Sequence, residues 1–381
     1  MRARDLPLPL EGTPGRWNAI TDVPGVEVGL VTLISDDESD SSKASRTGVT
    51  AILPLGRDRI GTSVAAAMHA LNGNGEMTGS HWIRETGSLA GPVMITNTHA
   101  VGTVHRGVIE WTARHRPELG AEWLLPVVAE TWDGYLNAIN EAHVTTDHAG
   151  AAIDAACTGP LEEGSVGGGT GMNCYEFKGG TGTASRLVDY AGVRYTVGVL
   201  VQANFGARHE LRVGGVPMGD LDAANPIGDG EWIAADRNRV APGGAGSVIV
   251  VVATDAPLLP QQCESLARRV PVGLARTGTT GSHFSGDLFL AFSTGSPGAL
   301  DGGFPGPEPD GEGLRTVTFV PWNRMDRFFR ATVECVEEAV LNALVANRSM
   351  VGRDGHLSPA LPLDEVAARL AGVGQKPNHL A

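Results

Sequence analysis

The stretch Ala241-Pro-Gly-Gly-Ala-Gly-Ser247, followed by the unbroken apolar run 248–253, is the strongest structural signal in this chain. A glycine-rich approach ends on a serine, and the serine heads a predicted buried strand. Such a serine can attack the peptide bond on its own amino side and become a new N-terminus. It would then carry a hydroxyl and an α-amine on one residue, a recognised way to activate a weak nucleophile. The alternative is a glycine loop entering a core strand, with Ser247 as an ordinary strand residue.

The composition is that of a folded, acidic protein. The 381 residues suffice for one large domain or two ordinary ones, and 42% of them are apolar. Charged residues make up 19%, which does not indicate disorder. The formal net charge of −14 argues against binding nucleic acid through a general electrostatic field. The 52 glycines favour tight turns and close backbone approach over a bulky aromatic core.

Cysteine spacing and the N-terminal sequence bear on the cellular compartment. The four cysteines are far apart and form no C-x-x-C, so we expect free thiols, mostly buried, in a reducing compartment. The N-terminal Met-Arg-Ala-Arg-Asp-Leu-Pro lacks the apolar stretch of a signal peptide. No run reaches the ~20 apolar residues of a membrane span. We therefore expect a cytoplasmic protein without a membrane partner.

Hydrophobic patterns predict a chain that mixes helices and strands. Apolar residues three or four apart predict helices over 98–114 and 322–346. Alternating or continuous apolar residues predict strands over 22–31, 48–53, 93–96, 195–202, 247–254 and 288–293.

Two polar stretches rich in glycine and proline, 225–246 and 296–313, are predicted loops. The first divides the chain just before Ser247, but at no obvious domain boundary. The strands on either side are too apolar to be the edges of separate domains. We therefore expect one domain over residues 1–381, with a sheet shared across the 246–247 junction.

Common cofactor and metal motifs are missing from the sequence. The run GSVGGGTG (164–171) lacks the Gly-Lys-Ser/Thr ending of a Walker loop and suits close backbone packing better than nucleotide binding. His99 and His105 are six apart on a predicted helix and so lie on different faces, and His143 and His148 flank Asp147 without a ligand spacing. No G-x-S-x-G elbow occurs. We expect no metal and no cofactor.

Several polar residues adjoin predicted strands. Singly, each suits a cap, a turn or a satisfied core polar group. Together with Ser247 they supply the acids, hydroxyls and neutral donors of a hydrolase, although spacing alone does not show that they converge. These residues are Glu130, Tyr135, Asn204, Ser285 and Asp287.

Six motifs, in order, cover roughly residues 22–348. They are Asp22-Val-Pro-Gly-Val-Glu-Val-Gly29, Thr47-Gly-Val-Thr-Ala-Ile-Leu-Pro54, Gly167-Gly-Gly-Thr-Gly-Met172, Tyr175-Glu-Phe-Lys-Gly-Gly180, Val201-Gln-Ala-Asn-Phe-Gly206 and Ala253-Thr-Asp-Ala-Pro-Leu-Leu-Pro260. With them the sequence resembles the family of L-aminopeptidase/D-amidase-esterases and β-peptidyl aminopeptidases, which are self-cleaving N-terminal serine hydrolases. The resemblance implies an α+β fold, a four-layer αββα sandwich like that of N-terminal-nucleophile hydrolases with different connectivity. It also implies a homotetramer of processed two-chain units.

The resemblance assigns the central roles in the reaction. Ser247 falls where the family has its nucleophile, so cleavage after Gly246 would give chains 1–246 and 247–381. Asn204 matches the oxyanion-hole asparagine, and Tyr135 matches a tyrosine that assists there. Glu130 matches the acid that receives the substrate's amino group.

Two further residues are assigned in the same way. Ser285 and Asp287 match a serine and an acid near the nucleophile. Some members have glutamate at the second position, and the aspartate here is one methylene shorter.

The expected activity is release of small L-, D- or β-amino acids from short peptides, amides and esters that have a free amino terminus. Two alternatives stay open. One is an acyltransferase related to the ornithine acetyltransferases, which use a threonine nucleophile. The other is an uncleaved, non-enzymatic ligand-binding protein.

Overall fold

Two β-sheets packed face to face form the centre of the molecule. The computed structural model describes residues 1–230, 232, 246–303 and 313–373. Sheet A contains, in spatial order, β1 (Glu27–Ser35), β2 (Ser45–Leu53), β5 (Val93–Asn97) and β6 (Val127–Thr131). Sheet B contains, in spatial order, β4 (Ser88–Leu89), β3 (Val64–Gly73), β14 (Ser285–Ser293), β13 (Gly246–Thr254), β10 (Val193–Asn204) and β9 (Gly180–Tyr190).

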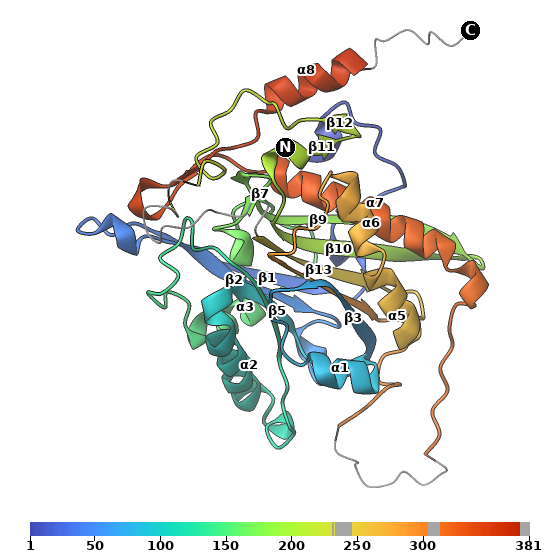
Figure 1. The fold of residues 1–381 in the computed structure, drawn as a ribbon. Coiled ribbons are helices and arrows are strands. Elements are labelled where there is room, and N and C mark those ends of the chain that lie inside the picture. Colours follow the sequence, from blue (N-terminus) through green and yellow to red (C-terminus); the bar gives the residue numbers. More distant parts are fainter. Residues whose placement is uncertain (231, 233–245, 304–312, 374–381) are drawn as a thin grey trace, which may run out of the picture.

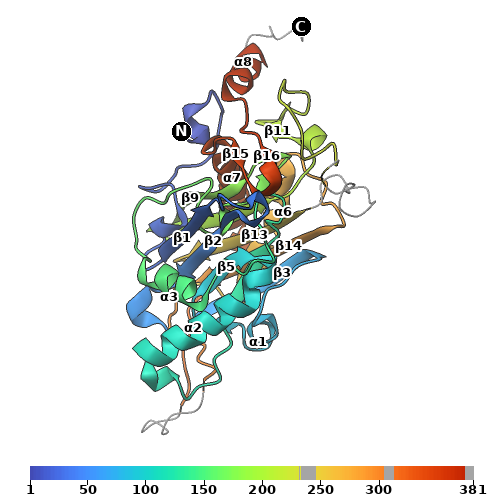
Figure 2. The ribbon, with the colours of Figure 1, turned by 90° about the vertical axis from the view of Figure 1, so that its left-hand side faces the viewer.

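Helices cover the outer face of each sheet. Sheet A is covered by α2 (Val101–His115) and α3 (Thr146–Asp154). Sheet B is covered by α5 (Pro260–Ala267), α6 (Val270–Arg276) and α7 (Asp326–Val345). Figures 1 and 2 show the two helical layers on opposite sides of the paired sheets. The resulting order is the four-layer αββα sandwich that the resemblance implies.

The remaining elements lie outside these four layers. The helices are α1 (Ser80–Thr86) and α8 (Leu363–Val373), the latter just before the C-terminal residues in Figure 1. The short strand pairs are β7 (Asn173–Cys174) with β8 (Phe177–Lys178), β11 (Arg212–Val213) with β12 (Val216–Pro217), and β15 (Met350–Val351) with β16 (Leu357–Ser358).

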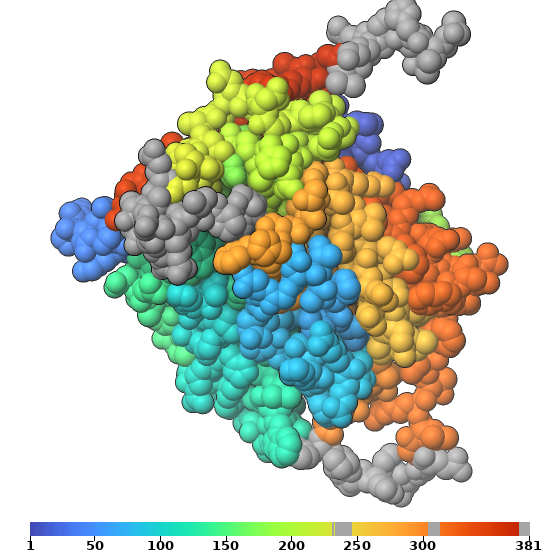
Figure 3. All heavy atoms as spheres, in the orientation of Figure 1, coloured from blue at the N-terminus to red at the C-terminus, as the bar shows by residue number. Residues whose placement is uncertain are grey.

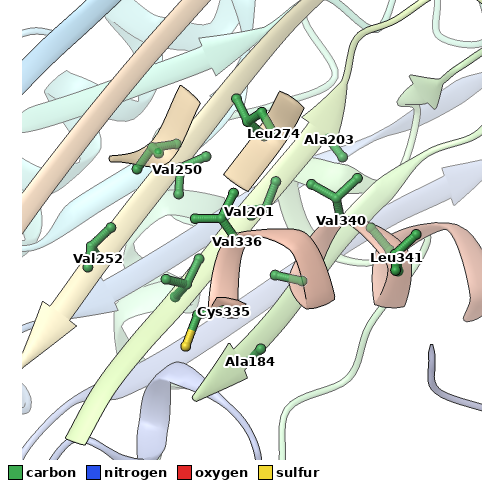
Figure 4. Packing of buried hydrophobic residues seen from close by; sticks show 14 of the residues in the cluster. Ala184, Val201, Ala203, Val250, Val252, Leu274, Cys335, Val336, Val340 and Leu341 are labelled. Atoms are coloured by element: carbon green, nitrogen blue, oxygen red, sulfur yellow. The ribbon is translucent and has the colours of Figure 1, made fainter. Parts of the chain in front are cut away.

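The apolar run of β13 is continuous because both faces of sheet B are buried. Val248, Val250 and Val252 pack toward the helices, and the alternate residues Ile249 and Val251 pack between the two sheets. Figure 4 shows the first of these cores, in which Val250 and Val252 lie with residues of α6 and α7. A strand buried on both faces reads as an unbroken hydrophobic run.

Residues on both sides of the 246–247 junction share sheet B. β13 pairs antiparallel with β10 and parallel with β14, and β14 pairs antiparallel with β3. The predicted shared sheet is therefore present.

Most predicted elements are found, with shifted ends. The predicted strand 22–31 is wrong at its start, because Ile20–Asp22 is a 3₁₀ turn and β1 begins at Glu27. The predicted helix 98–114 is a 3₁₀ turn, Thr98–Ala100, followed by α2, and the predicted helix 322–346 contains α7. The predicted strand 288–293 begins earlier, so Ser285 and Asp287 lie inside β14 instead of preceding it.

The two predicted loops fall largely outside the described residues. Residues 225–230 form turns and residues 296–303 contain no helix or strand, while 231, 233–245 and 304–312 lie outside the description. Three of the four cysteines are buried and Cys157 is exposed, all as free thiols, which confirms the predicted thiol state and burial. No helix in the described part of the chain is long and apolar enough to cross a membrane.

Candidate active site

Sheet pairing brings three of the predicted site residues around the start of β13. Ser247 lies opposite Asn204 of β10, and its neighbour Gly246 lies opposite Ser285 of β14. Asp287 lies two residues further along β14, opposite Val248. The hydrogen-bond ladders of two neighbouring strands thus fix these groups relative to the serine.

Ser247 is buried at the edge of the inter-sheet core. Its side chain follows the alternation of Ile249 and Val251, which pack between the sheets. Its Oγ donates a hydrogen bond of 2.7 Å to the carbonyl oxygen of Gly246. The hydroxyl therefore lies against the carbonyl group on its own amino side.

The side-chain amide of Asn204 is held at both ends. The backbone N–H of Asn173 donates to its Oδ1 at 2.8 Å, and its Nδ2 donates to the carbonyl oxygen of Trp132 at 3.0 Å. The Asn173 contact fixes which end of the amide is oxygen. Since Nδ2 carries two protons, one of them remains for a group bound beside Ser247.

Ser285, Asp287 and Asn72 form a buried polar cluster on the strands beside β13, on the helix-facing side of sheet B that Val248 shares, whereas the Ser247 side chain lies on the other side. Ser285 Oγ donates to Asp287 Oδ1 at 2.5 Å, and Asn72 Nδ2 donates to Asp287 Oδ2 at 2.8 Å. Burial raises the pKa of Asp287, and the hydrogen bonds from Ser285, Asn72 and Val248 counter part of that rise. The two β14 side chains also line a cavity of about 230 Å³.

Three distant chain segments frame that cavity. They are the end of β3, the residues that directly follow β10, and α6 with the loop after it. The cavity lining includes Leu71, Phe205, Leu274 and Ser282. In Figure 3 the blue, yellow-green and orange surfaces of these segments adjoin one another on a single face.

Glu130 lies on sheet A near the end of β6. Its Oε1 accepts the backbone N–H of Glu76 at 3.0 Å, and its Oε2 accepts the hydroxyl of Thr98. Burial raises the pKa of the Glu130 carboxyl, and these two hydrogen bonds counter part of that rise. A Cβ placed on Gly75 would lie 3.2 Å from Glu130 Oε1 and 3.1 Å from Cα of Gly286, the residue paired with Ser247. One glycine therefore separates this acid from the strand beside the serine.

Tyr135 lies in an aromatic cluster. Its ring stacks on His356 at a centroid distance of 4.8 Å and meets the edge of Trp232 at 5.2 Å. Its hydroxyl donates to the carbonyl oxygen of Leu357 at 3.0 Å, and burial raises its pKa to about 12. Among the described contacts, this hydroxyl bonds the carbonyl of Leu357, and none joins it to Ser247 or Asn204, so its role beside the serine stays a prediction.

The glycine-rich run 164–171 packs closely against other backbone, as its composition favoured. A Cβ on Gly169 would come within 2.4 Å of the Thr181 nitrogen, and one on Gly171 within 2.1 Å of the Arg46 carbonyl oxygen. Glycine is required at both positions by contact distance. Within the described ranges, no group of three His, Cys, Asp or Glu side chains is placed to hold a metal ion.

Two groups that contact the site residues were not anticipated from the sequence. Asn72 is the second-last residue of β3, a strand that its alanine-rich sequence concealed, and Thr98 opens the turn before α2. Each contacts its carboxylate only through tertiary packing. No local pattern distinguishes either residue from an ordinary polar residue at the end of an element.

The four layers, with a buried serine heading a central strand beside an amide, a hydroxyl and an acid, define a variant of the Ntn hydrolase fold. The same architecture occurs in the solved L-aminopeptidase D-Ala-esterase/amidase of Ochrobactrum anthropi, described as a prototype for the serine aminopeptidases and a new variant among the Ntn hydrolase fold. That structure superposes with a TM-score of 0.86 at 42% identity, covering 98% of this chain and 99% of the other.

The chain belongs to peptidase family S58, whose model matches residues 18–358. It is 47% identical over 374 residues to the β-peptidyl aminopeptidase of Sphingosinicella microcystinivorans, covering 97% of this chain and 91% of the relative. The structure of a Burkholderia sp. β-aminopeptidase superposes with a TM-score of 0.86 at 43% identity, covering 99% of this chain and all of the other, 100%. The protein is thus an enzyme, a serine peptidase of family S58.

Proposed function

We propose that this chain is an autoprocessed N-terminal serine aminopeptidase. It cleaves itself between Gly246 and Ser247 and then releases the first residue of short peptides, amides and esters through an acyl-enzyme on Ser247. The observation that carries the proposal is the position of the Ser247 hydroxyl, 2.7 Å from the Gly246 carbonyl oxygen, at the head of a rigid central strand.

Self-cleavage follows from this position by an acyl shift. The Ser247 oxygen adds to the Gly246 carbonyl carbon, the C–N bond breaks, and the nitrogen takes up the hydroxyl proton. Water then hydrolyses the resulting ester, leaving a carboxylate on Gly246 and a free α-amine on Ser247. The products are chains 1–246 and 247–381, which remain joined through sheet B.

Intact mass spectrometry tests this step. Wild-type protein should give two masses, for residues 1–246 and 247–381, with Ser247 at the new N-terminus. Ser247→Ala should give one inactive chain. A fully active enzyme that remains a single 381-residue chain would refute the proposal.

In turnover the new α-amine serves as the general base. Its intrinsic pKa of about 7.7–8.0 suits a base that works near neutral pH. Ser285 and Asp287 hold the amine or relay its proton. The free Nδ2 proton of Asn204 donates to the developing oxyanion, and Tyr135 assists there once its hydroxyl leaves Leu357.

Kinetics of Asn204→Ala test the oxyanion role. An oxyanion donor acts in the transition state, and its removal costs about 2.7–4 kcal/mol. We expect kcat to fall about a hundred-fold or more with little change in KM. Unchanged kcat in the processed variant would remove Asn204 from the site.

Glu130 selects substrates with a free amino terminus. A buried carboxylate is costly to desolvate unless an opposite charge replaces the lost water, and a substrate ammonium supplies that charge. An N-acetylated substrate cannot, so it should be rejected. Equal kcat/KM for alanyl-p-nitroanilide and its N-acetyl form would refute this role.

The names of two relatives support our expectation that the first residue of the substrate is a small β-, D- or L-amino acid. One is named for β-peptides and another for L-amino and D-alanyl substrates. Ammonium recognition fixes one end of the substrate, so slack around the first residue would admit an extra methylene or inverted chirality. Comparing β-alanyl-, D-alanyl- and L-alanyl-p-nitroanilide tests this, and hydrolysis of the L-alanyl substrate alone would refute it.

The assembly and the location stay predictions from the sequence. We propose a homotetramer of processed two-chain units in the cytoplasm. Light scattering of the purified enzyme tests the tetramer, and cell fractionation tests the compartment.

A further inference from the structure

We propose that Lys178 is a positioning residue for Asn204, acting through the peptide group between Met172 and Asn173. This inference rests on the proposed function, because it concerns how the oxyanion donor is held. Lys178 belongs to the β7–β8 hairpin, a part of the sequence motif 175–180 to which the reaction described so far assigns no role.

One peptide group links the lysine to the asparagine. Lys178 Nζ donates to the carbonyl oxygen of Met172 at 2.8 Å. The N–H of the same peptide group, on Asn173, donates to Asn204 Oδ1 at 2.8 Å. The Nδ2 end of that amide faces the Trp132 carbonyl and retains a second proton. The hydrogen bonds thus run head to tail from the lysine to the oxyanion donor.

Hydrogen bonds in such a chain polarise one another. A donor on the Met172 carbonyl makes the Asn173 N–H a stronger donor, and that N–H in turn makes Asn204 Nδ2–H a stronger donor. The same bonds fix the orientation of the amide, so its nitrogen does not turn away from the site. Both effects favour the transition state in which the oxyanion forms.

Lys178 is fully buried, and its head group is placed by few contacts. Its Nζ donates to Met172 O and, at 2.7 Å, to Gly179 O. Burial lowers the pKa of Lys178 to about 7, against the opposing influence of Cys174 and Asp133. The amine remains a hydrogen-bond donor in its neutral form as well, so the link to Met172 does not depend on the charge.

The two carbonyls do not need the lysine for their own satisfaction. Met172 O also accepts the backbone N–H of Gly179 at 2.9 Å, and Gly179 O also accepts Asn347 Nδ2 at 2.8 Å. A buried amine at this position is costly to desolvate and leaves no acceptor orphaned when removed. A purely structural role therefore gives little reason to place a lysine here.

The test is Lys178→Met, alone and combined with Asn204→Ala. Methionine keeps the length and removes the donor. In the processed single variant we expect kcat to fall about five-fold and KM to stay within about two-fold of wild type. The loss is modest because each hydrogen bond in such a chain strengthens the next by only a fraction of its energy. In the Asn204→Ala background, Lys178→Met should cause no further loss.

Thr277→Val is the matched control. Thr277 Oγ1 bonds the hydroxyl of Tyr175, at the tip of the same hairpin, at 2.7 Å and away from the Met172–Asn173 peptide. The Thr277→Val variant should lower the unfolding free energy without changing kcat. If Lys178→Met does not fold, Lys178→Leu, which also lacks a side-chain donor, is measured by the same criteria.

The outcomes separate the two proposals. If kcat is lowered in Asn204→Ala but unchanged in Lys178→Met, the inference about Lys178 is overturned and the oxyanion role of Asn204 is not. The same holds for an equal five-fold loss in both backgrounds, because the lysine would then act independently of Asn204. Unchanged kcat in Asn204→Ala would overturn the oxyanion role and this inference with it.

Discussion

Two buried carboxylates, Glu338 and Glu130, are held in opposite ways. Glu338 on α7 forms ion pairs with Arg186 at 2.6 Å and Arg4 at 2.8 Å, and it accepts a hydrogen bond from Asn18. Burial alone would raise the pKa of Glu338, but these partners outweigh it and lower the pKa. Glu130 has a hydroxyl and one backbone N–H instead, and its pKa is raised.

Under the proposed function, the difference separates an acid that stabilises the scaffold from one that meets the substrate. Among the described residues, neither Glu130 nor Asp287 forms an ion pair, although both are almost fully buried. A carboxylate whose pKa is raised by burial, close to a candidate nucleophile, is a candidate for a functional residue. Under the proposed function the missing counter-charge arrives with the substrate at Glu130 and with the Ser247 amine at Asp287.

Glu338→Gln should produce the largest change, and in stability. Breaking a buried ion pair costs about 3–5 kcal/mol, and here Arg186 would keep Glu334, at 3.5 Å, as an acidic partner, so we expect a loss toward the lower end of that range. We expect urea unfolding to show that loss, while kcat per folded molecule is unchanged at low temperature. A stable variant with low kcat would contradict the assignment of Glu338 to the scaffold.

Glu130→Gln should show the reverse pattern. Glutamine keeps an acceptor for Glu76 N–H or Thr98 but cannot pair with an ammonium. Losing one partner of a desolvated charge pair costs about 2–5 kcal/mol of binding, so kcat/KM should fall about a hundred-fold. The unfolding free energy should change by less than about 1 kcal/mol, because no buried cation is left behind. A variant that loses stability and keeps its activity would break the comparison.

The sequence predicts some elements of the fold well and misses others. The runs of β13 and the periodicity of α7 are strong local signals, and both elements occur close to their predicted bounds. β3 and β9 were missed because alanine, glycine and threonine dominate them, and such residues carry little strand signal until packing is known.

The site was less accessible to sequence reasoning than the fold. The candidate residues came from family resemblance, and spacing alone did not bring them together. Glu130 lies close to the strand beside Ser247 only because Gly75 is placed between them, near both Glu130 and Gly286. That Tyr135 donates to Leu357 depends on a strand pair more than two hundred residues further along the chain. Contacts of this range have no local pattern.

Asp287→Asn tests the second unpaired acid. Asparagine is nearly isosteric and keeps hydrogen bonding to Ser285 or Asn72, but it removes the charge that would hold the Ser247 ammonium. We expect kcat to fall about ten- to a hundred-fold and processing to slow, with little change in KM. Ser285→Ala is the companion variant and should have a smaller effect, because the carboxylate remains. Equal activity of Asp287→Asn and wild type would place this cluster outside the reaction.

The smallest effect is the pH dependence that these acids impose. Burial raises the pKa of Glu130 and Asp287, so each takes up its proton at a higher pH than an exposed carboxyl does. Both must be ionised to pair with an ammonium, and kcat/KM should therefore fall as pH drops through the raised values, about tenfold per unit for a single proton.

The stability of the fold responds to pH in the opposite direction. The folded state binds these protons more tightly than the unfolded chain, so both carboxyls favour folding more as pH falls. Glu338, with its lowered pKa, loses its stabilising effect over a more acidic range. Activity should consequently decline on acidification before the fold does, which parallel kcat/KM and unfolding measurements check. In Glu130→Gln the Glu130 contribution to the acid limb should disappear, and an identical limb in that variant would show that Glu130 does not set it.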